Sequence, residues 1–137
     1  MSDVHEGGCL CGAVRWRATG GPKNVNHCHC EMCRRAGGSA FATFATFATA
    51  DFSYTKGAPK TFARSDLENA VTREFCAECG THLTTRRPGL PAVILKVGTL
   101  DDPALFGTPQ AAIYTVDKQA FHHIPDGLPA FEGLPKR

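Results

Sequence analysis

The sequence lacks any long apolar run, and it carries little net charge. A membrane-spanning helix needs about 20 consecutive apolar residues, and no segment of the 137 residues approaches that length. The formal net charge is only +2. The basic residues are scattered, with no platform of aromatic and basic side chains that would indicate a nucleic-acid-binding surface. We therefore expect neither a membrane partner nor a nucleic-acid partner.

The residues before the first cysteine lack the apolar stretch of a secretory signal, because residues 1–8 are polar. We therefore expect a cytoplasmic protein whose thiols stay reduced. The cysteine count points the same way. Seven cysteines are an odd number, so a framework built only of disulfides would leave one thiol over.

The length of the chain favours one domain over residues 1–137. We expect residues 1–7 to form a loose leader and residues 124–137 to form an irregular tail rich in proline and glycine. The 14 glycines and 9 prolines imply many turns.

Short strand patterns between these turns predict an all-β fold with little helix. Three Phe-Ala-Thr triplets fill residues 41–49, where Phe44 would point away from the face shared by Phe41 and Phe47. This arrangement suits a strand that is buried on both sides. Single helical turns are expected at 31–36 and 101–106. Further strands are expected at residues 13–18, 52–55, 61–64, 72–75, 81–85, 92–97 and 111–116.

Three of the cysteines, Cys28, Cys30 and Cys33, follow the spacing C-x-C-x2-C. Three thiolates from one short segment can hold zinc and leave one of its four tetrahedral positions open. Catalytic zinc sites keep such a position for water or substrate. These residues are therefore candidates for a catalytic metal site.

The other four cysteines form two close pairs, each followed directly by a glycine. Two such pairs far apart in sequence are the usual build of a closed, structural zinc site. A glycine after each pair suits a tight turn with positive φ. The ligands of this candidate site are Cys9, Cys11, Cys76 and Cys79.

A second division of the cysteines is also compatible with the spacing. Cys30 and Cys33 could join Cys76 and Cys79 in a ribbon-type site. That division leaves Cys9, Cys11 and Cys28 as the second set. The closeness of Cys28 to Cys30 favours the first division.

These segments resemble the glutathione-dependent formaldehyde-activating (GFA) family. The resemblance rests on residues 8–15, 28–35, 75–81, 98–103 and 126–129. It implies a zinc-stapled β-tent of several short coiled antiparallel sheets. It also implies that Cys9, Cys11, Cys76 and Cys79 hold a structural zinc, and that Cys28, Cys30 and Cys33 hold a labile catalytic zinc.

The resemblance further implies carbon–sulfur lyase chemistry on a small thiol adduct. The family's named reaction joins glutathione and formaldehyde to give S-hydroxymethylglutathione. Zinc can hold a bound thiol as its thiolate, or polarise an aldehyde oxygen. An anionic set of three sulfur ligands suits the first role better.

Side chains beside the three cysteines are candidates for substrate contacts. Arg34 and Arg35 are suited to binding the carboxylates of a thiol such as glutathione, unless they lie in solvent. The histidines His27, His29 and His82 are either acid–base groups or partners of the metal ligands. We expect His122 and His123 on the surface.

The alternative to an enzyme is a non-catalytic binding module with two structural metal sites. In that case a protein residue such as His29 would fill the fourth position beside the three cysteines. An enzyme leaves that position to water or substrate, so the fourth ligand distinguishes the two hypotheses.

Overall fold

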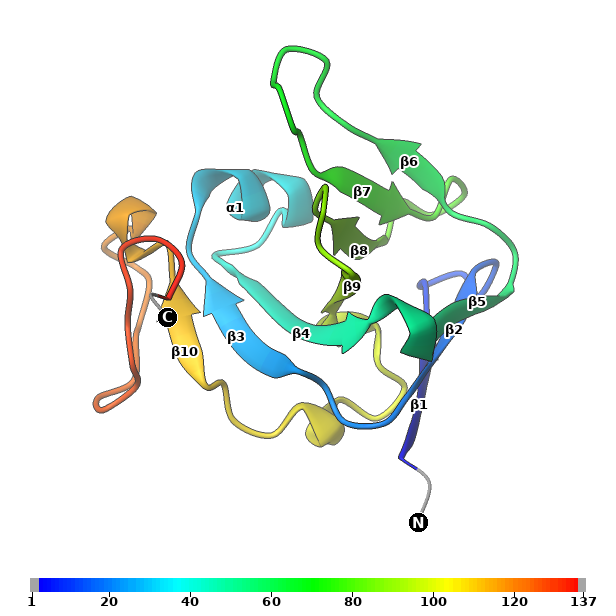
Figure 1. Ribbon diagram of the computed structural model, residues 1–137, viewed down its shortest axis with the longest axis horizontal. Coiled ribbons are helices and arrows are strands. Elements are labelled where there is room, and N and C mark those ends of the chain that lie inside the picture. Colours follow the sequence, from blue (N-terminus) through cyan, green and yellow to red (C-terminus); the bar gives the residue numbers. More distant parts are fainter. Residues whose placement is uncertain (1–2, 136–137) are drawn as a thin grey trace.

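The computed structural model describes residues 3–135, which form ten strands in two sheets and one α-helix. A three-stranded sheet has the order β1-β2-β5, and a seven-stranded sheet has the order β10-β3-β4-β9-β8-β7-β6 (Figure 1). The expectation of an all-β fold is confirmed. The strands are β1 (Val4–Gly8), β2 (Arg15–Thr19), β3 (Asn24–Cys28), β4 (Ala42–Ala48), β5 (Phe52–Lys56), β6 (Lys60–Phe62), β7 (Thr72–Phe75), β8 (His82–Arg86), β9 (Ala92–Lys96) and β10 (Ala111–Ile113).

Antiparallel pairing joins neighbouring strands throughout both sheets, with one difference from the expectation. Strand β10 pairs with β3 in parallel, so that Ile113 lies opposite Cys28. A parallel neighbour requires a long crossover connection, and the chain between β9 and β10 supplies it. Strand β10 therefore ends beside the first of the three clustered cysteines.

The N-terminal segment is a strand from Val4 onward, so the expected loose leader over residues 1–7 is wrong for residues 4–7. Strand β1 pairs with β2 across its whole length. A side chain at Gly7 would overlap the Thr99 carbonyl oxygen and the Trp16 ring. Glycine is depleted in strands, but here it permits this close approach, and the two glycines hide the strand from sequence patterns. Residues 1–2 lie outside the described range.

The main hydrophobic core lies between the two sheets. Trp16, Leu83, Val93 and Leu95 are 0% exposed within it. A second, smaller cluster packs on the other face of β4 and comprises Cys28, Ala42, Phe44, Ala111 and Ile113. Phe47 belongs to the first cluster and Phe44 to the second, which confirms a strand buried on both sides.

The helix α1 (Glu31–Gly37) begins and ends at residues with clear capping roles. The sulfur of Cys30, the N-cap, accepts a hydrogen bond from the Cys33 N–H at 3.2 Å. Gly38 ends the helix in the left-handed conformation, with φ of 63°. The expected helical turn at 31–36 is thus confirmed, one residue longer. Of the clustered cysteines, Cys33 lies within the helix and Cys30 caps it.

The last predicted strand is shorter than expected. Strand β10 stops at Ile113 because Tyr114 adopts a left-handed conformation with φ of 54°. A 3-10 turn, Thr115–Asp117, then replaces the strand expected up to residue 116. The turn expected at 101–106 is also a 3-10 helix, Pro103–Phe106.

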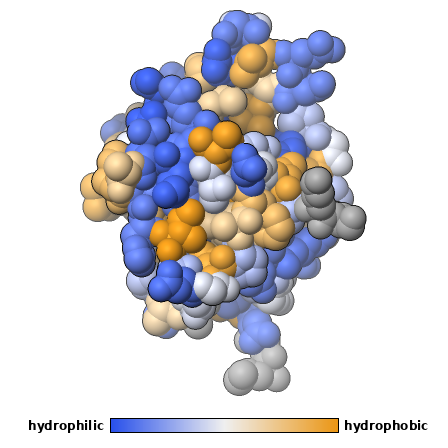
Figure 2. Space-filling model, turned by 90° about the vertical axis from the view of Figure 1, so that its left-hand side faces the viewer, coloured by the Kyte–Doolittle hydropathy of each residue, from blue (hydrophilic) through white to orange (hydrophobic). Residues whose placement is uncertain are grey.

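The C-terminal tail lies along β10 (Figure 1). Over residues 124–135 it is irregular, as expected, and a hydrogen bond from Phe131 N–H to the Ala112 carbonyl (2.9 Å) holds it there. Residues 136–137 lie outside the described range. The outward face of the tail is mixed. Figure 2 shows apolar patches separated by hydrophilic atoms on this side, and Phe121 and Leu134 are exposed. None of the helices between residues 3 and 135 has the length and apolar character that a membrane crossing requires.

Candidate metal centres and thiol cavity

The two cysteine pairs converge although they belong to different sheets. Cys9 and Cys11 lie in the turn between β1 and β2, and Cys76 and Cys79 lie in the turn between β7 and β8. All four sulfur atoms lie within 4.8 Å of one another. Cys9 and Cys76 are buried, whereas Cys11 is exposed at the surface.

The two turns are built alike. Cys9 N–H donates to the Val14 carbonyl (3.0 Å), and Cys76 N–H donates to the Thr81 carbonyl (3.0 Å). Gly12 and Gly80 have φ of 81° and 80°, the left-handed conformation that glycine adopts without strain. Each turn therefore directs its pair of thiols toward the other turn.

The spacing of these sulfurs fits a tetrahedral metal site. The Cys9–Cys11 and Cys11–Cys76 sulfur pairs are each 3.7 Å apart. A disulfide requires about 2.05 Å, whereas four sulfurs at about 2.3 Å from one zinc would be about 3.8 Å apart. The Thr81 hydroxyl, followed by backbone N–H groups, lowers the pKa of Cys79 to about 5. This favours the thiolate that binds metal.

The other three thiols form a second, separate cluster. Cys28 ends β3, Cys30 caps α1, and Cys33 lies in its first turn. Their sulfur atoms lie within 4.8 Å of one another. The seven sulfurs therefore group as four and three, and not as the ribbon-type alternative.

The sulfurs of the second cluster lie close enough together to shift one another's pKa values. Hydrogen bonds from Cys28 and Cys30, followed by the charges of Lys96 and Arg73, lower the pKa of Cys33. The pKa of Cys28 is raised, first by its sulfur neighbours Cys30 and Cys33 and then by burial. Cys33 is thus the group that most readily becomes a thiolate.

Cys28, Cys30 and Cys33 all line a cavity of about 450 Å³. Its apolar wall includes Phe44, Ile94 and Ile113, and residues 67–71 of the β6–β7 connection form its far side. Three cationic side chains also line it: Arg73, Arg87 and Lys96. Arg73 holds its Nη1 atom buried without a hydrogen-bond partner.

Sequence patterns do not single out these cations, because they lie far in the chain from Cys28, Cys30 and Cys33. Arg73 comes from β7 and Lys96 from β9, and only the order of strands in the seven-stranded sheet brings them to α1. A single arginine or lysine in a short strand resembles any solvent-facing residue. The pattern therefore contained no signal for this part of the cavity.

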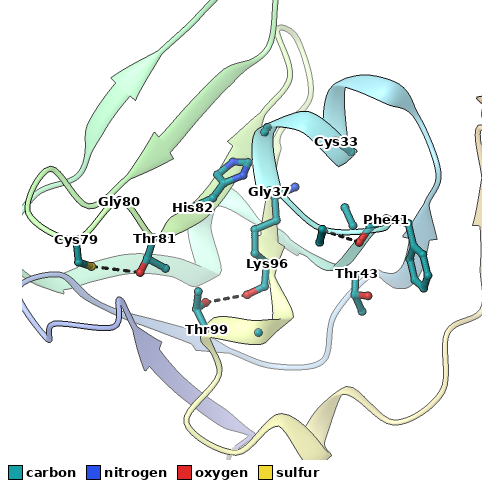
Figure 3. Close-up of a pocket in the computed structure, with 14 residues that line it drawn as sticks. Cys33, Gly37, Phe41, Thr43, Cys79, Gly80, Thr81, His82, Lys96 and Thr99 are labelled. Atoms are coloured by element: carbon teal, nitrogen blue, oxygen red, sulfur yellow. Dashed lines mark hydrogen bonds between the residues drawn. The ribbon is translucent and has the colours of Figure 1, made fainter.

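A second cavity of about 520 Å³ lies on the other side of Cys33. Lys96 and His82 line it together with Cys79 of the four-cysteine cluster. Figure 3 shows the Lys96 side chain extending from β9 toward α1, with the Cys79–Thr81 contact at the opposite end of the cavity. Burial, followed by the charges of Lys96 and Arg73, lowers the pKa of His82 to about 4, so this ring is neutral near pH 7.

The predicted substrate arginines lie elsewhere on α1. Arg35 forms an ion pair with Glu31 at 3.0 Å, and its side chain is 70% exposed. It lines a third hollow of about 570 Å³, beside the cavity that holds the sulfurs. Arg34 donates its backbone N–H to the Cys30 carbonyl (3.1 Å) and lines none of the three described cavities.

The expectation that His122 lies on the surface is wrong. His122 is 5% exposed and His29 is 0% exposed, and their Nδ1 atoms lie 3.0 Å apart. The Gln119 N–H donates to His122 Nδ1, so His29 must be the donor of the pair. The His122 ring also packs edge-on against Phe41, a long-range contact that local sequence does not encode.

Histidine does not complete the three-cysteine cluster. Among residues 3–135, no histidine or carboxylate lies within 4.8 Å of all three sulfurs. His27 instead packs between the rings of Phe41 and Phe106. His29, which a structural module would use as the fourth ligand, is directed to His122.

Several known proteins are similar to this chain. A Halomonas elongata protein named as a putative glutathione-dependent formaldehyde-activating enzyme is 28% identical over 77% of this chain and 70% of its own. An uncharacterized lyase of Schizosaccharomyces pombe is 34% identical over 58% of this chain and 55% of its own. In the crystal structure of a Rhodobacter sphaeroides protein, 96% of that chain superposes on 76% of this one, with a TM-score of 0.60 and 25% identity.

The profile of the family described as glutathione-dependent formaldehyde-activating enzyme matches residues 4–117. This range contains both thiol clusters and most of the cavity lining. The chain therefore belongs to the GFA family.

Proposed function

We propose that this protein is a zinc-dependent carbon–sulfur lyase that acts on adducts of a small thiol. The representative reaction is the joining of glutathione and formaldehyde to S-hydroxymethylglutathione, and its reversal. The observation that carries the proposal is the three-thiol cluster at the wall of a 450 Å³ cavity. Names of two relatives, a formaldehyde-activating enzyme and a lyase, support it.

The donor sets fit two zinc ions with different roles. Cys9, Cys11, Cys76 and Cys79 would hold a closed structural zinc, and the second would lie on Cys28, Cys30 and Cys33. Zinc bound to the second set would supply a position that holds a substrate thiol as its thiolate at neutral pH. The four-cysteine cluster is thus proposed to stabilise the fold, and the three-cysteine cluster to carry out the reaction.

The proposed reaction forms and breaks one carbon–sulfur bond. In the forward direction a new bond joins the thiol sulfur to the formaldehyde carbon, and the formaldehyde oxygen gains the proton that the thiol loses. In the reverse direction the same bond breaks and formaldehyde leaves. Lys96 and Arg73 line the cavity beside Cys33, and their positive charges offset the negative charge of the thiolates. Phe44 and Ile94 form an apolar part of the cavity wall that could pack against the carbon atoms of the substrate.

The rest of the protein is proposed to be one cytoplasmic domain over residues 1–137. Within it, Arg35 lines the hollow next to the thiol cavity and is the member of the Arg34–Arg35 pair placed to contact an extended peptide thiol. The alternative of a binding module requires a protein ligand in the fourth position. The absence of such a group from the described residues supports the enzyme instead.

Exchange of formaldehyde with glutathione tests this proposal. Two-dimensional exchange NMR measures the rate with zinc-loaded protein and, as background, without protein. The wild type should accelerate the exchange above this background. Cys30→Ser should remove the acceleration while one zinc per chain, on the four-cysteine site, is retained. Equal rates with and without wild-type protein would exclude the lyase activity on this adduct.

A further inference from the structure

The guanidinium of Arg73 is the least satisfied charged group in the thiol cavity. Its Nη1 atom is buried, and no hydrogen-bond partner reaches it. Buried donors in proteins are nearly always paired, so an unpaired one calls for an explanation such as a missing ligand. Arginine stays protonated, so this donor carries charge at any pH at which the protein is folded.

Glu74, the carboxylate nearest to Arg73 in sequence, does not form an ion pair with it. Side chains of consecutive strand residues point to opposite faces, and Glu74 lies on the face away from the cavity. Its Oε1 atom accepts hydrogen bonds from the Tyr54 hydroxyl (2.8 Å) and from Arg86 Nε (3.0 Å). The ion pairs between residues 3 and 135 join other residues, namely Arg15 with Asp101, Arg35 with Glu31, Arg64 with Asp66 and Arg86 with Glu74.

Three acidic residues also line the cavity, and two of them already have partners within the protein. Glu31 is exposed and pairs with Arg35. Asp117 accepts the Glu31 N–H at 3.1 Å, and Glu68 is exposed in the β6–β7 connection. The three cations are partly buried in the cavity wall, as is Asp117. Arg73 differs from the acidic groups because it forms none of the ion pairs among residues 3–135 and keeps an unpaired donor, so an anionic group of a ligand could offset its charge.

Arg73 lies between two neighbouring cavities. It lines both the 450 Å³ cavity that contains the three cysteines and the adjoining 570 Å³ hollow. A cavity of this size suits a small molecule of a few hundred cubic ångströms. If the thiol group of a ligand lay at the three cysteines, the other end of the same ligand would lie near Arg73.

We infer that Arg73 binds a carboxylate of the substrate thiol and thereby selects anionic thiols over neutral ones. Arg73 lines the cavity, and a planar guanidinium can hold a carboxylate by two parallel hydrogen bonds. The unpaired Nη1 shows that no group of the described chain satisfies this guanidinium in full. The inference rests on the proposed function, since it assigns a substrate class to the same site. It adds a carboxylate contact on β7 to the one proposed for Arg35 on α1.

The test compares two thiols on zinc-loaded protein by calorimetric binding. Glutathione carries carboxylates, and 2-mercaptoethanol carries none. Arg73→Met should weaken glutathione binding about 10- to 100-fold, the loss expected for hydrogen bonds to a charged group. Binding of 2-mercaptoethanol should change less than about 2-fold. Arg17→Met is the matched control because Arg17 is exposed on β2 of the other sheet, and it should leave both thiols unaffected.

Two further measurements keep the inference testable if Arg73→Met does not fold. Arg73→Lys keeps the positive charge but loses the planar pair of donors. Its affinity for glutathione should lie between those of the wild type and the methionine variant. On unaltered protein, glutathione diethyl ester should bind about 10-fold more weakly than glutathione. Equal losses for both thiols in Arg73→Met, or equal binding of the ester, would overturn the role of Arg73. If wild-type protein binds neither thiol, the proposed function itself fails.

Discussion

The sulfur atoms of Cys11 and Cys76 lie 3.7 Å apart although 65 positions separate the two residues in the chain. Cys11 belongs to the β1–β2 turn of the three-stranded sheet, and Cys76 to the β7–β8 turn of the seven-stranded sheet. A hydrogen bond from Leu10 N–H to Thr81 Oγ1 (3.1 Å) supports the same junction. A metal held here would therefore join the two sheets at the edge of the main core.

Cys79→Ser should destabilise the whole fold. A structural zinc contributes folding free energy on the order of ~10 kcal/mol, comparable with the total stability of a small domain. We expect an insoluble or unfolded variant by circular dichroism. Cys30→Ser is the control and should stay folded, because the sulfur it removes belongs to the other cluster. A soluble Cys79→Ser protein with an unchanged melting temperature would contradict the structural role.

Mild chelation should separate the two sites. The three-cysteine site opens to a cavity and has no fourth protein ligand among the described residues, so its metal should exchange more easily. A colorimetric chelator at moderate concentration should remove one zinc per chain while far-ultraviolet circular dichroism remains constant. Simultaneous loss of both metals with unfolding would argue against a separate labile site.

Glu74→Gln should reduce stability near neutral pH. Burial alone would raise the pKa of Glu74, but hydrogen bonds from Thr84, Tyr54 and Arg86 outweigh it and lower the pKa. A lowered carboxylate pKa stabilises the fold above the unfolded value of about 4.3, and this contribution is lost as pH falls through the folded value. Denaturation with urea should give a loss of about 1–3 kcal/mol at pH 7.

The difference between wild type and Glu74→Gln should stay constant from pH 8 to about 5 and shrink only below about pH 4. Both proteins share the thiol clusters, so metal release at low pH cancels in the difference. Glu78→Gln serves as the control, since Glu78 is exposed in the β7–β8 turn. A difference that grows on acidification would contradict the stabilising role of the Glu74 carboxylate.

Local spacing predicts that Cys28, Cys30 and Cys33 cluster, because one short segment carries all three. It leaves two divisions of the cysteines open, and the meeting of the Cys9–Cys11 turn with the Cys76–Cys79 turn decides between them. The opposite faces of Phe44 and Phe47 followed from strand alternation. The placement of Arg73 and of His122 depended on strand order and on the path of the tail. Such long-range placement leaves no local pattern, and these residues could not be predicted from the sequence.

Cadmium-113 NMR of the cadmium-substituted protein tests most directly whether the second cluster is an open thiol site. Cadmium prefers the same thiolate ligands as zinc, and its chemical shift reports the number of bound sulfurs. We predict two resonances, one from four sulfurs and one from three. Glutathione should move only the second, toward the position of the first. A single resonance, or a second resonance that glutathione leaves unchanged, would contradict this account.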